Sequence, residues 1–207
     1  MIITLDDFGL SEEANKEIYN WTQTKKVDFV SLLPNFPYTK EAIELDKNNR
    51  KKEYSLGLHF NLIEGKPLCK KIIIPSLVNN NGYFFPLPLF ILRLFVGLIR
   101  KEEIMKELQK QYDVFIENNI KCVHINSHQN IHVFHFMYSC IEEFAKKNDI
   151  KYIRQVPTIK NRLKKFPIKY FSFTLLYFIS SLLFSSYTHK QTSFYESTYH
   201  PGTTYDL

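Results

Sequence analysis

The sequence predicts an α/β protein with a mainly parallel sheet. Short apolar runs typical of buried strands alternate with longer segments whose apolar residues recur at helical spacing. Such alternation is typical of strand–helix–strand units, whose strands pair in parallel. No repeat or linker divides the 207 residues, so one domain, 1–207, is expected.

The first element is expected to be a buried strand at 2–5, which leads into the acidic pair Asp6 and Asp7. Ser11 is a favourable N-cap for a following helix, because its side chain can accept a hydrogen bond from the first turn. Two glutamates in that turn favour the positive end of the helix dipole. The expected helix carries apolar residues at helical spacing: Ala14, Ile18 and Trp21.

Five further strands are expected from apolar runs that end at turn-forming or polar residues. They lie at 29–33, 55–60, 121–126, 152–156 and 194–198. Two more helices are expected between them, because apolar residues recur there at three- and four-residue intervals. These helices are centred on 104–116 and 137–144.

Two apolar segments, 83–99 and 170–187, do not fit this alternation, and the second is at the lower length limit for a membrane span. A span would place His200 or His128 across the bilayer from Asp7. If all these residues form a single site, neither segment can span the membrane. Core helices are the first expectation, an amphipathic surface resting on a membrane is the second, and a true membrane span is the third.

The composition is that of an ordinary globular protein, with 44% hydrophobic and 23% charged residues. The formal net charge is +6. No nucleic-acid-binding motif accompanies it, so a lysine-rich solvated surface is expected and a nucleic-acid partner is not. Three scattered cysteines and the absence of a signal-peptide pattern predict a reducing, cytoplasmic location.

Polar side chains follow the expected strands where active sites of α/β folds are built. In the strand at 121–126, alternation places His124 and Asn126 on one face, and His128 continues that face. His59 ends another strand. Two imidazoles and the carboxylate of Asp7 suit zinc or another divalent metal. Asp6 would then be free to take a proton from an attacking water. Taken singly, each histidine also fits a core position, and the acidic pair fits a loop or helix cap.

The chain resembles the YdjC-like carbohydrate deacetylases in six segments that occur in the family's order. They are the opening D-D-F-G at 6–9 with Ser11, G-x-H-x-x-L at 57–62, E-L-x-x-Q at 107–111, H-x-D-S-H-x-H-x-H at 124–132, an arginine at Arg154, and E-x-x-x-H-P at 196–201.

This resemblance implies an incomplete TIM-like (β/α) barrel and an enzyme that removes an N-acetyl group from an amino sugar or oligosaccharide. It implies a magnesium or zinc ion held by Asp7, His59 and His128. Asp6 would be the general base and His200 the general acid. The residues expected to bind substrate or support the site are Asn61, His124, Asn126, His132 and Arg154.

Three departures from the family pattern open alternatives. Asn126 replaces an aspartate, Asn130 replaces a histidine, and the chain stops at Leu207, sooner than its relatives. A catalytically impaired homologue that binds metal or sugar is one alternative. A membrane-associated deacetylase of a lipid-linked sugar is another, which would add peripheral membrane contact to the N-acetylated sugar as a partner. A homodimer is also left open.

Overall fold

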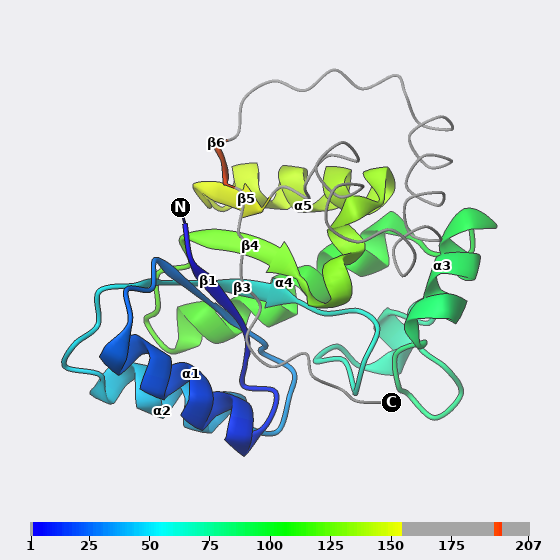
Figure 1. The fold of residues 1–207 in the computed structure, drawn as a ribbon. Coiled ribbons are helices and arrows are strands. Elements are labelled where there is room, and N and C mark those ends of the chain that lie inside the picture. Colours follow the sequence, from blue (N-terminus) through cyan, green and yellow to red (C-terminus); the bar gives the residue numbers. More distant parts are fainter. Residues whose placement is uncertain (1, 155–192, 196–207) are drawn as a thin grey trace, which may run out of the picture.

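A computed structural model describes residues 2–154 and 193–195, and it contains a sheet of six parallel strands (Figure 1). The strands pair in chain order, β1-β2-β3-β4-β5-β6. They are β1 (Thr4–Phe8), β2 (Phe29–Leu32), β3 (Ser55–Phe60), β4 (His124–Ser127), β5 (Tyr152–Arg154) and β6 (Ser193–Tyr195). Within the described residues β1 and β6 do not pair, so the sheet is an open, incomplete TIM-like barrel, as predicted.

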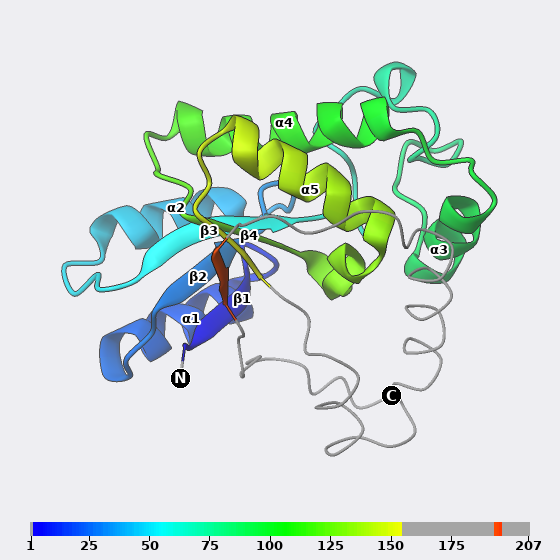
Figure 2. The same cartoon turned by 90° about the horizontal axis from the view of Figure 1, so that it is seen from above.

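Helices connect the strands and pack against the sheet. They are α1 (Glu12–Thr24), α2 (Thr39–Asn48), α3 (Leu87–Phe95), α4 (Lys101–Glu117) and α5 (His135–Lys147), with short 3-10 turns η1 (Lys71–Ile73) and η2 (His128–Val133). In Figure 1, α1 and α2 lie together below the strands and α5 lies above them; Figure 2 shows α5 beside α4. The predicted cap of α1 is confirmed, since Ser11 accepts a hydrogen bond from the Ala14 amide.

The acidic pair lies inside the first strand and not after it, which corrects the expected boundary. In the pairing with β2, Leu5 faces Val30 and Phe8 faces Leu32, so β1 contains one extra residue. Asp7 lies within this irregularity of the pairing. Its φ of 67° is a left-handed conformation, which is costly for a non-glycine residue. The bulge redirects the chain, so that consecutive carboxylates can serve one site from one strand.

Gly57 is required by the packing of His124 across the sheet. Gly57 lies between Ser31 on β2 and His124 on β4 in register. The His124 ring passes over Gly57 and its Nε2 lies 2.9 Å from Ser31 Oγ. A Cβ on residue 57 would lie 2.2 Å from the ring, too close for any side chain.

Gly57→Ala is therefore expected to lower the free energy of unfolding by about 3 kcal/mol, the upper range for overpacking a core. Denaturant unfolding measures this loss. In the double variant Gly57→Ala/His124→Ala the ring is absent, so the loss is expected to be smaller than the sum of the two single losses. Strictly additive losses would show that the ring is not the obstacle.

The apolar segment at 83–99 contributes α3 to the fold, partly as a core element. Phe90 and Ile91 are buried, whereas Leu92 is 58% exposed. Within the described residues, no helix is both long and apolar enough to cross a membrane. The other apolar segment, 170–187, lies outside the described residues. One helix, α2, was not predicted.

Candidate metal centre

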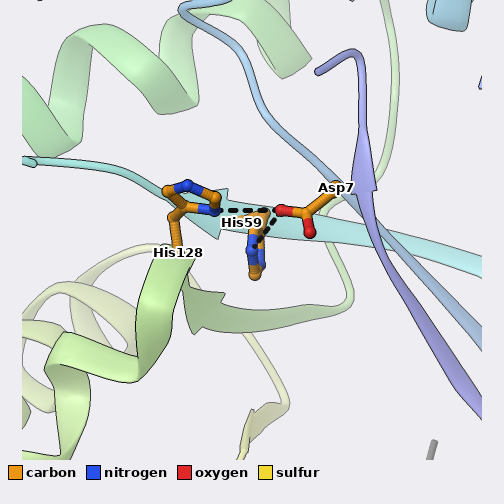
Figure 3. A group of neighbouring side chains, drawn as sticks. All are labelled: Asp7, His59 and His128. Atoms are coloured by element: carbon orange, nitrogen blue, oxygen red, sulfur yellow. Dashed lines mark hydrogen bonds and ion pairs between the residues drawn. The ribbon is translucent and has the colours of Figure 1, made fainter. Parts of the chain in front are cut away.

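Asp7, His59 and His128 meet at the ends of β1, β3 and β4 (Figure 3). One nitrogen or oxygen atom from each lies within 4.8 Å of the other two. Asp7 Oδ1 is 3.2 Å from His59 Nε2 and 2.9 Å from His128 Nδ1. Both histidines are buried and Asp7 is partly exposed, so the cluster is open toward solvent on the aspartate side. A carboxylate and two imidazoles that converge in this way are a donor set for a divalent metal.

Asn126 fixes the orientation and the tautomer of His59. Asp6 can only accept hydrogen bonds, so the Asn126 amide nitrogen that lies 2.9 Å from Asp6 Oδ1 must face it. The Asn126 carbonyl oxygen then faces His59 Nδ1 at 2.6 Å and accepts its proton. In the neutral ring, the lone pair of His59 is therefore placed on Nε2, the nitrogen that faces Asp7, which is the tautomer that a metal ligand needs.

Glu64 plays the corresponding part for His128. Its Oε2 lies 2.9 Å from His128 Nε2, while His128 Nδ1 faces Asp7. Each histidine of the cluster thus has one ring nitrogen bonded to an outer acceptor and the other directed at Asp7. This arrangement is typical of metal sites, where an outer hydrogen bond sets the ring orientation.

Charge and hydrogen bonding in the cluster favour ionised groups. Burial alone would raise the pKa of Asp7, but hydrogen bonds and charge from His128 and His59 hold it well below its usual range. Burial would lower the pKa of His128, but Asp7 and Glu64 raise it to about 9. The hydrogen bond with His128 also lowers the pKa of Glu64. A concentration of negative charge therefore faces the two imidazoles, as a cation site requires.

Asp6 forms a buried ion pair beside the cluster. Both guanidinium NH2 groups of Arg154 donate to its carboxylate, at 2.5 and 2.7 Å, in the bidentate geometry that is strongest for this pair. Asp6 Oδ1 is also 3.8 Å from His59 Nδ1. Asp6 and Arg154 are each only 4% exposed. Asp6 is therefore held rigidly behind the three candidate ligands.

Comparisons with known proteins agree with these motifs. A family model described as "YdjC-like protein" matches residues 1–203. The chain belongs to the YdjC-like family.

Among curated relatives, a carbohydrate deacetylase from Clostridium beijerinckii is 29% identical over 77% of this YdjC-like chain and 61% of the relative. A carbohydrate deacetylase from Geobacillus stearothermophilus is 32% identical, over 77% of this chain and 60% of the relative. The chain thus spans less than two thirds of the length of these relatives. A crystal structure from Enterococcus faecalis, described as a candidate cellobiose-phosphate cleavage protein, superposes with a TM-score of 0.69 at 26% identity. That superposition covers 80% of this chain and 63% of the other.

The remaining residues of the YdjC-like block on β4 lie around the cluster. His124 is buried behind Asn126 and linked to it through Ser31, whose Oγ is 3.0 Å from the Asn126 amide nitrogen. Burial lowers the pKa of His124 to about 3, so its ring is neutral. His132 is buried one turn beyond His128, with Nδ1 2.6 Å from Ser127 Oγ. Ser127 also accepts a hydrogen bond from the His132 amide. His124 and His132 therefore support the framework of the site, and neither belongs to the three-residue cluster.

The E-L-x-x-Q segment of α4 holds the loop that carries Glu64. Gln111 exchanges two hydrogen bonds with the backbone of Asn61, at 3.0 and 2.7 Å. The Asn61 side chain accepts from the Ile63 and Glu64 amides and donates to the Glu64 carbonyl oxygen. Asn61 is buried, and its side chain shapes this turn and also donates to Asn35 Oδ1 at 3.2 Å. Asn61 thus helps to position the loop that carries Glu64, and its expected role in binding substrate or supporting the site stays a prediction.

Two contributors, Glu64 and Ser31, were not predicted. Ser31 is a polar residue in the middle of the apolar run at 29–33, and that interruption was the available signal. Glu64 gives no such signal, because it lies in a loop and its contact depends on the path of the chain after β3. His200, the expected acid, lies outside the described residues.

Proposed function

We propose that this protein is a metal-dependent hydrolase that removes an N-acetyl group from an amino sugar or oligosaccharide. The observation that carries the proposal is the convergence of Asp7, His59 and His128 in a chain of the YdjC-like family. Curated relatives named carbohydrate deacetylases support the reaction and the substrate class.

The three converging side chains would hold a magnesium or zinc ion. When bound, such an ion lowers the pKa of water and polarises a carbonyl group, which is what amide hydrolysis requires. Asn126 favours the His59 tautomer whose Nε2 lone pair is available for this role, and Glu64 keeps the His128 ring in place. The ligand set combines a carboxylate, which suits magnesium, with two imidazoles, which suit zinc.

Asp6 is proposed as the general base that takes a proton from the attacking water. Arg154 and Asn126 fix its carboxylate with three hydrogen bonds, so it needs no reorganisation during the reaction. Collapse of the tetrahedral intermediate then needs a proton on the leaving nitrogen. His200 is proposed as the group that supplies it, giving acetate and a free amino sugar.

Glu64→Ala is expected to weaken metal binding by about 10- to 100-fold, the usual cost of losing an outer partner of a ligating histidine. Calorimetric titration of the full chain with Zn²⁺ measures this effect. Glu64→Gln keeps an oxygen acceptor for His128 Nε2 and is the matched control, so a smaller loss is expected. Equal Zn²⁺ affinity in wild type and Glu64→Ala would show that Glu64 does not support the metal centre.

The function is tested by acetate release from a panel of N-acetylated sugars, including chitooligosaccharides, with added metal and with chelator. Chelator-sensitive release is expected from at least one of them. A folded, metal-loaded protein that releases no acetate from the panel or from a lipid-linked amino sugar would favour a binding protein without catalysis. Asn126 and Asn130, where the family pattern differs, are the observation that keeps this second candidate open.

A further inference from the structure

The connection from β3 to α4 contains a long basic stretch, 65–100. It carries five basic residues and no acidic one: Lys66, Lys70, Lys71, Arg93 and Arg100. The whole chain is mixed in charge, with 27 Lys and Arg against 21 Asp and Glu. Arg100 pairs with Glu103 of α4 at 3.8 Å, and Arg93 is only partly exposed. The exposed positive charge of the stretch is therefore that of Lys66, Lys70 and Lys71, which gives their part of the surface a positive potential that attracts anions.

α3, in the middle of this stretch, exposes apolar side chains along one stripe. Leu89, Leu92 and Val96 recur at helical spacing and are 40%, 58% and 59% exposed. Leu98, just beyond the helix, is 52% exposed. We call these four residues the α3 stripe. Exposed leucines and valines gathered on one side of a helix are unusual on a solvated surface and mark a place of contact.

The opposite side of α3 is anchored to the body of the protein. Phe90 and Ile91 are buried, and the ring of Phe95 packs edge-on against Phe134 at 6.1 Å. The guanidinium of Arg93 lies over the ring of Phe85 at 4.3 Å and donates to the Ser76 carbonyl oxygen. The stripe is therefore presented outward by a helix whose inner side is held in place.

The α3 end of the molecule lies away from α1 and α2 in both views (Figures 1 and 2). The same stretch begins directly after Glu64, which contacts His128 of the candidate metal centre. Residues 65–100 therefore link Glu64 to α3 along the chain.

We infer that the α3 stripe and the exposed lysines of the same stretch, Lys66, Lys70 and Lys71, dock this protein on an anionic lipid bilayer. The apolar stripe can enter the boundary between headgroups and acyl chains while the lysine side chains meet anionic headgroups. Nucleic acid would use the positive charge but leave the stripe in water. Docking of this kind goes beyond the proposed deacetylation and does not depend on it.

Cosedimentation of the full chain with vesicles tests this inference. Binding is expected to vesicles of phosphatidylcholine with phosphatidylglycerol, to weaken as salt is raised, and to be slight on phosphatidylcholine alone. Lys70→Gln/Lys71→Gln is expected to weaken binding about thirtyfold, since each basic side chain near an anionic surface contributes roughly a factor of five. Leu92→Asp/Val96→Asp is expected to abolish it.

Ile116→Asp on α4 is the matched control, because Ile116 is 57% exposed but lies outside the basic stretch. It is expected to bind vesicles as wild type does, and all variants are expected to keep the wild-type melting temperature. Acetate release from a soluble sugar is expected to be unchanged in Leu92→Asp/Val96→Asp, which separates docking from catalysis. Two results would overturn the inference: no binding to anionic vesicles, or vesicle binding unchanged in Leu92→Asp/Val96→Asp. If that variant kept vesicle binding but dissociated a wild-type dimer, the stripe would be an interface between two copies of this chain.

Discussion

Asp6→Asn is expected to lower the rate of acetate release by about 10²- to 10⁴-fold, the range for loss of a general base. The amide is nearly isosteric with the carboxylate but cannot take a proton at neutral pH. Metal affinity is expected to stay within a few-fold of wild type, because Asp6 is not one of the three converging ligands. Steady-state kinetics and calorimetric titration on the same preparation measure both quantities.

Asp113→Asn on α4 is the control for that experiment, since this partly exposed aspartate bonds Gln109 on its own helix, outside the site. It is expected to keep wild-type rate and affinity. Asp7→Asn is expected to lose both together. If Asp6→Asn kept a wild-type rate, another group would have to be the base. If Asp6→Asn lowered metal affinity and the rate of acetate release in parallel, Asp6 would have to be reassigned as a metal ligand.

Arg154→Met is expected to lower the free energy of unfolding by about 3–5 kcal/mol. The guanidinium is 4% exposed and forms both hydrogen bonds of a bidentate pair with Asp6. Methionine fills much of the same volume but leaves the buried carboxylate without its cation, and an uncompensated buried charge is costly. Denaturant unfolding at neutral pH measures the change.

Lys146→Met provides the comparison, because the exposed Lys146 forms an ion pair with the partly exposed Glu142 on α5. Exposed pairs of this kind contribute about 0–1 kcal/mol, so a small loss is expected. Arg154→Lys restores one charge without the bidentate geometry and should fall between the two. A loss in Arg154→Met no larger than in Lys146→Met would contradict the interpretation of this pair as a buried support for Asp6.

Periodicity predicted most of the strands and the longer helices. The strand at 55–60 lies as expected, and alternation correctly placed His124 and Asn126 on one face of β4, where they meet Ser31. α2 was missed, because it lacks a side-chain cap and its helical period is weak, with Ala42 and Ile43 as its buried apolar residues. Elements whose burial depends on one or two side chains leave little signal in a sequence.

The site was predictable in composition but not in its arrangement. Strand ends and histidine spacing indicated Asp7, His59 and His128, and the structure brings these three together. The bulge at Asp7 follows from the register with β2, and the contact of Glu64 follows from how Gln111 and Asn61 fold the loop. Both depend on residues distant in the sequence, so no local pattern could indicate them.

The most direct test of the metal centre is a calorimetric titration of the full chain with Zn²⁺ and with Mg²⁺, alongside the Asp7→Asn variant. We expect one divalent ion to bind per chain with at least one of the metals, and we expect that binding to be lost in Asp7→Asn. If wild type bound neither ion, or if Asp7→Asn bound as tightly as wild type, then Asp7, His59 and His128 would not form a metal centre and the proposed mechanism would fail.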